Sequence, residues 1–284
     1  MFFLLAVFML NACQDTSQEE LTVNVPAKGK LFIIGGGKRP TEMVKDMIHL
    51  SGVDTAGYIA VLPMASSVPD TSAYYAMKQF EDLGVAEVFN FNFQDSIDFS
   101  SSKVDSLENA SLIYISGGDQ NLFMEKVKST AVFDAIHKAY KQGAFIAGTS
   151  AGAAVMSKRM ITGDEKKYPV YTGEFKTIEA NNIEIAEGLG LIKNVIIDQH
   201  FIQRMRMNRL ISTCLENPDA IGIGIDESTA ILVDGPNAKV YGTGQVIKLV
   251  HSKGETRIEG GLLGAKDMNL SVFLPGDSFT IYSF

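Results

Sequence analysis

One pattern recurs along this chain: a short, unbroken apolar run ends in a glycine-containing or polar turn, and a helical segment often follows. The apolar runs occupy residues 30–34, 58–62, 111–116, 144–147 and 194–198. Apolar residues at helical spacing lie between them, over 70–83 and, as two helices broken near Ser129, over 120–141. Runs without polar alternation are typical of strands buried on both faces, and their alternation with helices predicts a parallel sheet.

The predicted fold class is therefore α/β, with a doubly wound, mostly parallel sheet that binds ligands at the carboxyl ends of its strands. Residues 85–93 are also strand-like. After about residue 220 the sequence pattern changes to that of short β segments, at 221–225, 229–234, 238–250 and 279–284. These predict antiparallel additions at the edge of the sheet, not a separate domain.

The amino-terminal segment has a different character. MFFLLAVFML is an unbroken apolar run, about half the length that a membrane-spanning helix needs. It is typical of a signal peptide, which we place at residues 1–12. The next string, Leu10-Asn11-Ala12-Cys13, resembles a bacterial lipobox, whose cysteine becomes a lipid-modified amino terminus. Residues 13–28 would then tether a single domain, 29–284, to the bacterial cell envelope, on the periplasmic side or at the cell surface.

Charge and composition argue against several classes of protein. The chain has 25 Lys and Arg against 33 Asp and Glu, a net charge of −8, and no basic block, so no nucleic-acid partner is expected. Cys13 and Cys214 form no CxxC pair, and the four histidines show no HExxH spacing. We therefore predict no metal site and no organic cofactor. Membrane contact would occur through the lipid anchor only, and any self-association would give a homodimer.

The strongest local motif is Gly148-Thr-Ser-Ala-Gly152, which fits G-x-S-x-G. It follows an apolar strand and precedes a segment that can open a helix, which is the context of a nucleophile elbow. The sharp turn would lift the hydroxyl of Ser150 above the edge of the sheet. Ser150 is therefore the predicted nucleophile, and a tight turn without a catalytic role is the competing interpretation.

A serine nucleophile needs a base and an acid that orients it. His200 is the predicted base because it follows the strand at 194–198 and should emerge at the same edge as Ser150. The spacing does not choose the acid. The acidic candidates are Asp164, Glu165, Glu174, Glu179, Glu184, Glu187 and Asp198.

Two further strand ends carry polar groups. The turn Ser116-Gly-Gly-Asp-Gln120 can present the N–H of Gly118 to an oxyanion, with the N–H of Ala151 as the second donor and Gln120 as a positioning group. A glycine-rich strand-to-helix turn with Asp119 as the N-cap is the competing interpretation. Three arginines follow His200 and suggest a pocket for substrate carboxylates, although surface ion pairs are the competing interpretation. They are Arg204, Arg206 and Arg209. The glycine run 35–37 is interpreted as a turn that lines the site entrance, because Pro40 breaks the dinucleotide-binding pattern.

Together these motifs resemble the cyanophycinases of serine peptidase family S51. The likeness covers about residues 30–250, and its motifs are Gly148-Thr-Ser-Ala-Gly-Ala153, Ser116-Gly-Gly-Asp-Gln120, Asp198-Gln-His-Phe201 with the three arginines, and Gly224-Ile-Asp-Glu-Ser-Thr-Ala230. The resemblance implies a three-layer sandwich of the flavodoxin-like or class I glutamine amidotransferase-like kind. It also implies a serine-type exopeptidase that works through an acyl-enzyme and a Ser-Glu-His triad.

The implied substrate is cyanophycin, a poly-aspartate chain with arginine on its side chains, or a related acidic or isopeptide substrate. Cleavage would release β-linked Asp-Arg units. Ser150 is the implied nucleophile, His200 the general base and Glu165 the acid, because Glu165 soon follows the segment Met160-Ile161. The implied substrate-binding residues are Gln120, Asp198, Gln199, Arg204, Arg206 and Arg209.

Three alternatives stay open. An aspartyl dipeptidase-like exopeptidase would cleave short Asp-X peptides and ignore polymer. A non-catalytic peptide-binding lipoprotein could retain Ser150 and His200. An α/β-hydrolase esterase would usually place its histidine after the acid near the chain end, where only His251 is available. A location outside the cytoplasm favours an enzyme that scavenges released polymer or another acidic peptide.

The lipobox gives a direct prediction. Cys13 should carry lipid, and the mature chain should begin at this residue because the preceding segment is removed. Intact-mass measurement and palmitate labelling of the expressed protein test this expectation. An unmodified chain that begins at Met1 in the soluble fraction would contradict it.

Overall fold

The computed structural model describes residues 29–94, 99–170, 172–251 and 255–281, so the predicted signal peptide, lipobox and tether lie outside the described residues. The helices are α1 (Thr41–Ser51), α2 (Pro69–Glu81), α3 (Ser101–Glu108), α4 (Gln120–Val127), α5 (Ala131–Gln142), α6 (Ala151–Ala154) and α7 (Met207–Glu216). The strands are β1 (Lys30–Ile34), β2 (Ile59–Leu62), β3 (Val88–Asn90), β4 (Leu112–Ile115), β5 (Phe145–Thr149), β6 (Arg159–Glu165), β7 (Ile183–Glu187), β8 (Val195–Gln199), β9 (Ile221–Ile225), β10 (Thr229–Asp234), β11 (Asn237–Gly242), β12 (Val246–Val250), β13 (Arg257–Glu259), β14 (Leu262–Gly264), β15 (Asn269–Phe273) and β16 (Ser278–Thr280).

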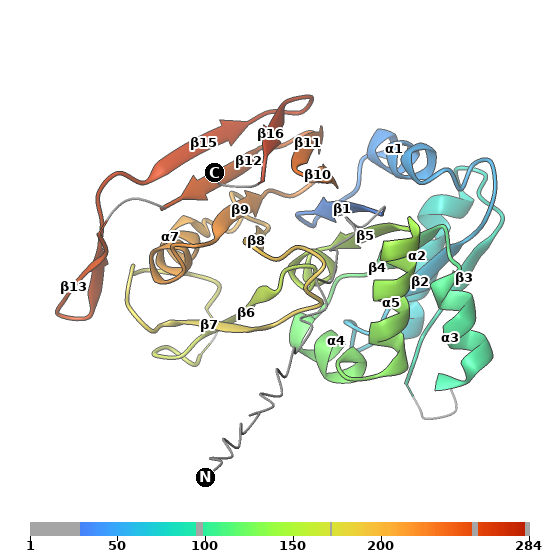
Figure 1. The fold of residues 1–284 in the computed structure, drawn as a ribbon, viewed down its shortest axis with the longest axis horizontal. Coiled ribbons are helices and arrows are strands. Elements are labelled where there is room, and N and C mark those ends of the chain that lie inside the picture. Colours follow the sequence, from blue (N-terminus) through green and yellow to red (C-terminus); the bar gives the residue numbers. More distant parts are fainter. Residues whose placement is uncertain (1–28, 95–98, 171, 252–254, 282–284) are drawn as a thin grey trace, which may run out of the picture.

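A mixed eight-stranded sheet forms the centre of the molecule, in the order β16-β11-β10-β1-β5-β4-β2-β3. Strands β1, β5, β4, β2 and β3 run parallel to one another. Strands β10, β11 and β16 extend this sheet in antiparallel fashion beyond β1. The predicted parallel α/β sheet with antiparallel additions at its edge is therefore confirmed (Figure 1).

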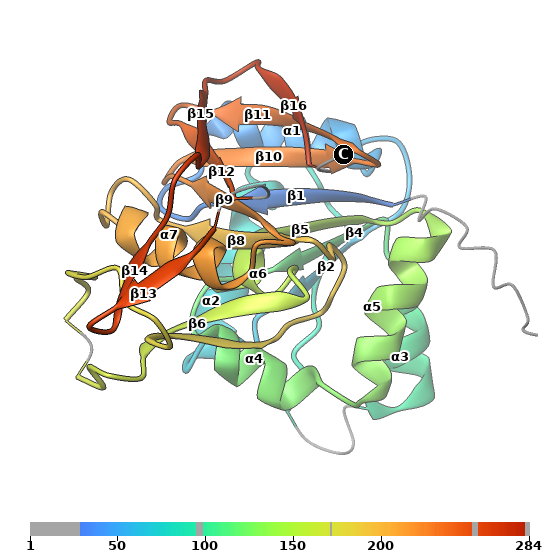
Figure 2. The ribbon, with the colours of Figure 1, turned by 60° about the vertical axis from the view of Figure 1, so that its left-hand side comes forward.

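A second sheet has the order β15-β12-β9-β8. It includes the apolar run predicted at 194–198, now β8, which pairs in parallel with β9 and not with a strand of the central sheet. The expectation that this run joins the central sheet was therefore wrong. Figures 1 and 2 show the second sheet beside the antiparallel end of the central sheet. The chain passes from the second sheet to the central one between β9 and β10.

The layers follow from the burial of the parallel strands on both faces. On one face, Phe32, Ile34 and Tyr114 pack with apolar side chains of α1 and α2. On the other face, Ile33 and Ile113 pack with α3, α4, α5 and α6 and with the inner residues of β8 and β9. The second sheet thus takes the place of a helix in one outer layer, and the three-layer sandwich is present.

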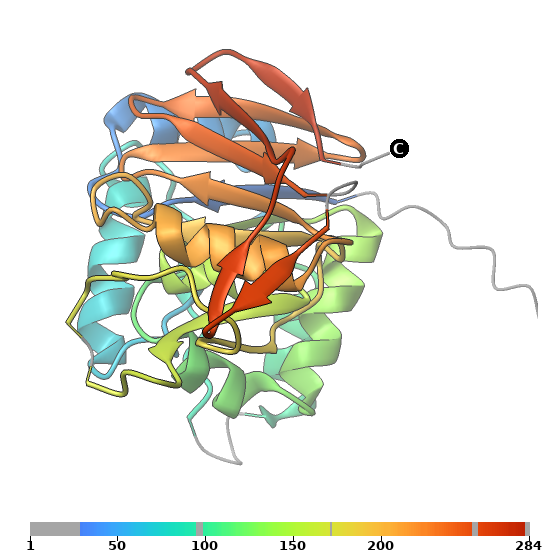
Figure 3. The same cartoon turned by 90° about the vertical axis from the view of Figure 1, so that its left-hand side faces the viewer.

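The remaining segments differ from the predictions mainly in their bounds. The predicted strand 85–93 is shorter, as β3, and the predicted β segment 238–250 is divided into β11 and β12. The hairpin β13–β14, red-orange in Figure 3, contacts residues 178–180 through backbone hydrogen bonds from Ala180 to Gly261 and from Leu263 to Ile178. Within the described residues, no helix is both long enough and apolar enough to cross a membrane.

Candidate active site

Ser150 lies in a sharp turn between β5 and the short helix α6. Its φ of 55° and ψ of −111° are unusual for a residue with a side chain, and its N–H donates a 3.0 Å hydrogen bond to the carbonyl of Ile34 at the end of β1. A Cβ at Gly152 would lie 2.3 Å from the carbonyl oxygen of Ile115, so a glycine is required there. The strand–turn–helix geometry of a nucleophile elbow is present.

The side chain of His200 reaches this serine from the second sheet. Its Nε2 lies 2.8 Å from the Ser150 Oγ. His200 directly follows β8, has a φ of 49°, and donates its N–H to the carbonyl of Gly35. A Cβ at Gly36 would lie 2.3 Å from the His200 Cε1, so the imidazole can occupy this place only because residue 36 has no side chain.

The carboxylate that contacts His200 belongs to Glu227, not to Glu165. The Oε1 of Glu227 lies 2.5 Å from the His200 Nδ1. A carboxylate accepts hydrogen bonds, so Nδ1 carries the proton in this contact and the neutral ring leaves Nε2 free to accept from Ser150. The two hydrogen bonds form a continuous line from Ser150 through His200 to Glu227.

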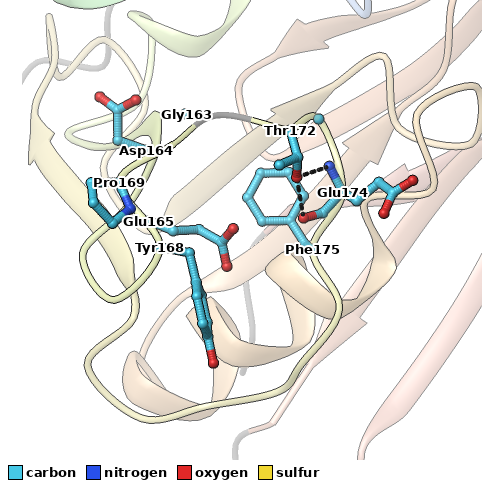
Figure 4. Close-up of a pocket in the computed structure, with 9 residues that line it drawn as sticks. Gly163, Asp164, Glu165, Tyr168, Pro169, Thr172, Glu174 and Phe175 are labelled. Carbon is cyan, nitrogen blue, oxygen red and sulfur yellow. Dashed lines mark hydrogen bonds between the residues drawn. The ribbon is translucent and has the colours of Figure 1, made fainter.

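The predicted acid, Glu165, takes part in another network. It lies at the end of β6 and accepts a 2.7 Å hydrogen bond from Nδ2 of Asn182. Figure 4 shows Glu165 in a small pocket with Tyr168 and Phe175, with the carboxylate of Asp164 pointing in a different direction. The prediction of Glu165 as the partner of His200 is therefore corrected, because the β6–β7 segment holds this carboxylate among its own residues.

The loop that carries Glu227 is held at both ends. The Oδ1 of Asp226 accepts hydrogen bonds from the backbone N–H groups of Ile202 and Gln203, two and three residues after His200. Ser228 donates its N–H to the carbonyl of Gly36 and its hydroxyl to the carbonyl of Lys38. These contacts fix the carboxylate against the imidazole. The glycine run at 35–37 therefore supports His200 and Glu227, which adds a structural role to the predicted one.

The pKa of His200 is lowered from its ordinary value. Burial of the ring is the largest cause, since it disfavours the charged imidazolium, and the positive charges of Arg204 and Arg206 act in the same direction. The hydrogen bond and negative charge of Glu227 act the other way and raise the pKa. The neutral ring that accepts a proton from Ser150 is thus favoured near neutral pH.

The three predicted arginines are not equivalent. Arg204 is exposed, whereas Arg206 and Arg209 are buried. Arg209 forms a bidentate ion pair with the carboxylate of Asp198. Its Nε lies 2.9 Å from Oδ2, and its Nη2 donates a hydrogen bond to Oδ1. The Nη1 of Arg206 donates to the backbone and side-chain oxygens of Gln199, at 2.6 and 2.7 Å. Asp198 and Gln199 thus hold the buried guanidinium groups in place.

These groups line a cavity on one side of Ser150, which we call the arginine-side cavity. Its volume is about 300 Å³, and its lining includes Gly118, Gln120, Ser150, Gln199, Arg204, Arg206 and Arg209. Arg209 Nη1 has no hydrogen-bond partner among the described residues, although Nε and Nη2 are paired. Gln120 donates its amide to the carbonyls of Ile161 and Thr162. The predicted substrate-binding residues, apart from Asp198 beneath Arg209, therefore meet at one cavity.

The predicted oxyanion donors also lie close to Ser150. Gly118 lines the arginine-side cavity together with Ser150. Ala151 is the next residue in the chain and the first residue of α6. Among the described residues, no group of three or more His, Cys, Asp or Glu is placed to hold a metal ion.

The family model and the individual relatives that match this chain point to the same family of peptidases. The model of peptidase family S51 matches residues 31–241. A cyanophycinase from Nostoc sp. is 32% identical over an alignment of 285 positions, which covers 96% of this chain and 93% of the relative. A cyanophycinase from Trichormus variabilis shows the same identity and coverage.

Solved structures share the fold. A peptidase from an acI-B1 Actinobacterium superposes with a TM-score of 0.64 at 22% identity, covering 89% of this chain and 97% of that one. A peptidase E-type protein from Listeria monocytogenes EGD-e superposes with a TM-score of 0.51 at 17% identity, covering 76% and 99%. At these identities the likeness concerns the architecture.

The buried Asp198–Arg209 pair predicts a large effect on stability. Arg209→Met should lower the free energy of unfolding by about 3–5 kcal/mol, because it removes the bidentate partner of the buried Asp198 carboxylate and leaves it the weaker contact with Arg206, 3.8 Å away. Arg204→Met is the matched control and should change it by less than about 0.5 kcal/mol, because Arg204 is exposed. Urea denaturation measures both. Equal stability of the two variants would contradict the structural role of the pair.

Proposed function

Because the chain belongs to peptidase family S51 and is a serine-type peptidase, we propose that Ser150, His200 and Glu227 form its catalytic triad. The observation that carries the proposal is the line of contacts from Ser150 Oγ to His200 Nε2, at 2.8 Å, and from His200 Nδ1 to Glu227 Oε1, at 2.5 Å. A nucleophile, a base and an orienting carboxylate in this order are what acyl transfer to a serine requires.

The proposed mechanism is hydrolysis through an acyl-enzyme. The Ser150 Oγ attacks the scissile carbonyl while His200 Nε2 takes its proton, and Glu227 stabilises the imidazolium that forms. The N–H groups of Gly118 and Ala151 are the proposed donors to the oxyanion. His200 then gives the proton to the leaving amine, and water hydrolyses the ester in a second round of the same steps.

The proposed substrate is an acidic peptide with β-linked Asp-Arg units, such as cyanophycin. The arginine-side cavity supports this choice, because Arg204 and the Nη1 of Arg209 offer positive charge to a substrate carboxylate. The cyanophycinases that resemble the chain over nearly its full length support the same class of substrate. With the lipid anchor at Cys13, which we also propose, the enzyme would act on polymer released outside the cytoplasm.

The activity can be tested by mass spectrometry of products. The wild-type protein should release β-Asp-Arg from cyanophycin, and Ser150→Ala should lower kcat by about 10⁴-fold or more without loss of folded structure. Parallel incubation with α-Asp-X dipeptides separates the two peptidase alternatives. Turnover of the dipeptides alone would favour an aspartyl dipeptidase, and near wild-type turnover by Ser150→Ala would contradict the triad.

The assignment of the acid gives a second prediction. Glu227→Gln should lower kcat by several orders of magnitude with little change in KM, because it removes the charge that stabilises the imidazolium. The acidic limb of the pH profile should also shift to lower pH, since the Glu227 carboxylate raises the pKa of His200. Glu165→Gln is the matched control and should be mild. The reverse ranking in steady-state kinetics would return the role to Glu165.

A further inference from the structure

A second cavity lies on the other side of Ser150, and we call it the histidine-side cavity. Its volume is about 320 Å³, and its lining includes Arg39, Tyr75, Tyr114, Thr149, Ser150 and His200. Of the residues that line the two cavities, Ser150 is common to both. The scissile bond must lie at Ser150, so a substrate that occupies the arginine-side cavity with one part can extend into the histidine-side cavity with the other.

Two buried hydroxyl groups line this cavity without an internal partner. Tyr114 is 1% exposed and Thr149 is 5% exposed. Within the part of the chain that the structure describes, neither the Tyr114 Oη nor the Thr149 Oγ1 forms a hydrogen bond. Buried hydroxyls are nearly always hydrogen-bonded, since an unsatisfied one is destabilising. A polar ligand atom at this wall of the cavity would supply the partner that both hydroxyl groups lack.

The charge of the lining comes from one residue, Arg39. Its Nε donates a 2.7 Å hydrogen bond to Gln79 Oε1, and its Nη1 donates to the carbonyl of Gly37 at 3.2 Å. These contacts use two of the five N–H groups of a guanidinium and hold it in place. The cavity therefore combines a fixed positive charge with two hydroxyl donors, which is a set of groups that suits a carboxylate.

The position of His200 decides which half of the substrate this cavity takes. In acyl transfer to serine, the protonated base gives its proton to the leaving amine nitrogen as the C–N bond breaks. The leaving group must therefore lie beside the imidazole. His200 lines the histidine-side cavity, whereas Gly118, a proposed oxyanion donor, lines the arginine-side cavity.

We infer that the histidine-side cavity is the leaving-group subsite and that it binds a carboxylate on the residue after the scissile bond. Arg39 supplies the charge, and Tyr114 and Thr149 supply hydroxyl donors. The inference rests on the proposed function, because it assumes that Ser150 and His200 perform acyl transfer. It adds a second point of recognition to the same site, on the opposite side of the bond that is cut.

The test uses substrates with one acyl part, a β-Asp-Arg unit, joined through its α-carbonyl to alanine, to alaninamide or to methanol. Alanine and alaninamide differ only in the leaving-group carboxylate. The full-length wild-type protein should prefer alanine by about tenfold or more in kcat/KM, which is the usual strength of a charge-assisted contact. Arg39→Gln should abolish this preference, and Tyr114→Phe should lower it by about three- to tenfold. Lys38→Gln, which removes the neighbouring exposed charge outside the cavity, is the matched control and should keep it.

The methyl ester separates the inference from the proposed function, because its leaving group carries no carboxylate. Ester hydrolysis by the wild type, together with equal kcat/KM for the alanine and alaninamide peptides, would overturn the subsite and leave the triad intact. An unchanged preference in both Arg39→Gln and Tyr114→Phe would also overturn it. Loss of the preference in Lys38→Gln as well would overturn Arg39 as the source of recognition. If the wild type hydrolyses neither ester nor peptide, the proposed function itself fails and the inference with it.

Discussion

The passage of the chain from the second sheet to the central sheet brings the site together. Ser150 follows β5 of the central sheet, His200 follows β8 of the second sheet, and Glu227 lies on the segment between β9 and β10 that joins the two. Backbone contacts at Gly35 and Gly36 hold these strand ends within hydrogen-bond distance. The Ser–His–Glu line therefore depends on how the two sheets meet, and a change in their packing would separate its members.

Electrostatics differ between the two sides of Ser150. On one side, buried Arg206 and Arg209 are paired with oxygens of Gln199 and Asp198, so positive groups can remain at the cavity without an isolated charge in the interior. On the other side, Arg39 is the charged residue of the lining. His200 lies between them with a lowered pKa, because burial and the nearby arginines outweigh Glu227. This balance keeps the imidazole neutral and able to act as a base.

The Glu165 prediction failed for a physical reason. Its position soon after the segment Met160-Ile161 says nothing about which strands pair, and β6 pairs with β7 so that Glu165 meets Asn182. A usable signal was present in the sequence. Asp226 and Glu227 directly follow the apolar run 221–225, in the same strand-end position that identified Ser150 and His200. Applied to the later strands, the rule would have included Glu227 among the candidates.

The sequence by itself determined the α/β class, the nucleophile turn and the placement of His200 at a strand end, because apolar runs, glycines and the residues after them are local features. It did not determine that β8 and β9 form a second sheet, since a buried strand has the same apolar character in either sheet. It also did not distinguish the exposed Arg204 from the buried Arg209. The contact of His200 with Glu227 and the two cavities arise where segments distant in sequence meet, and only the tertiary structure decided them.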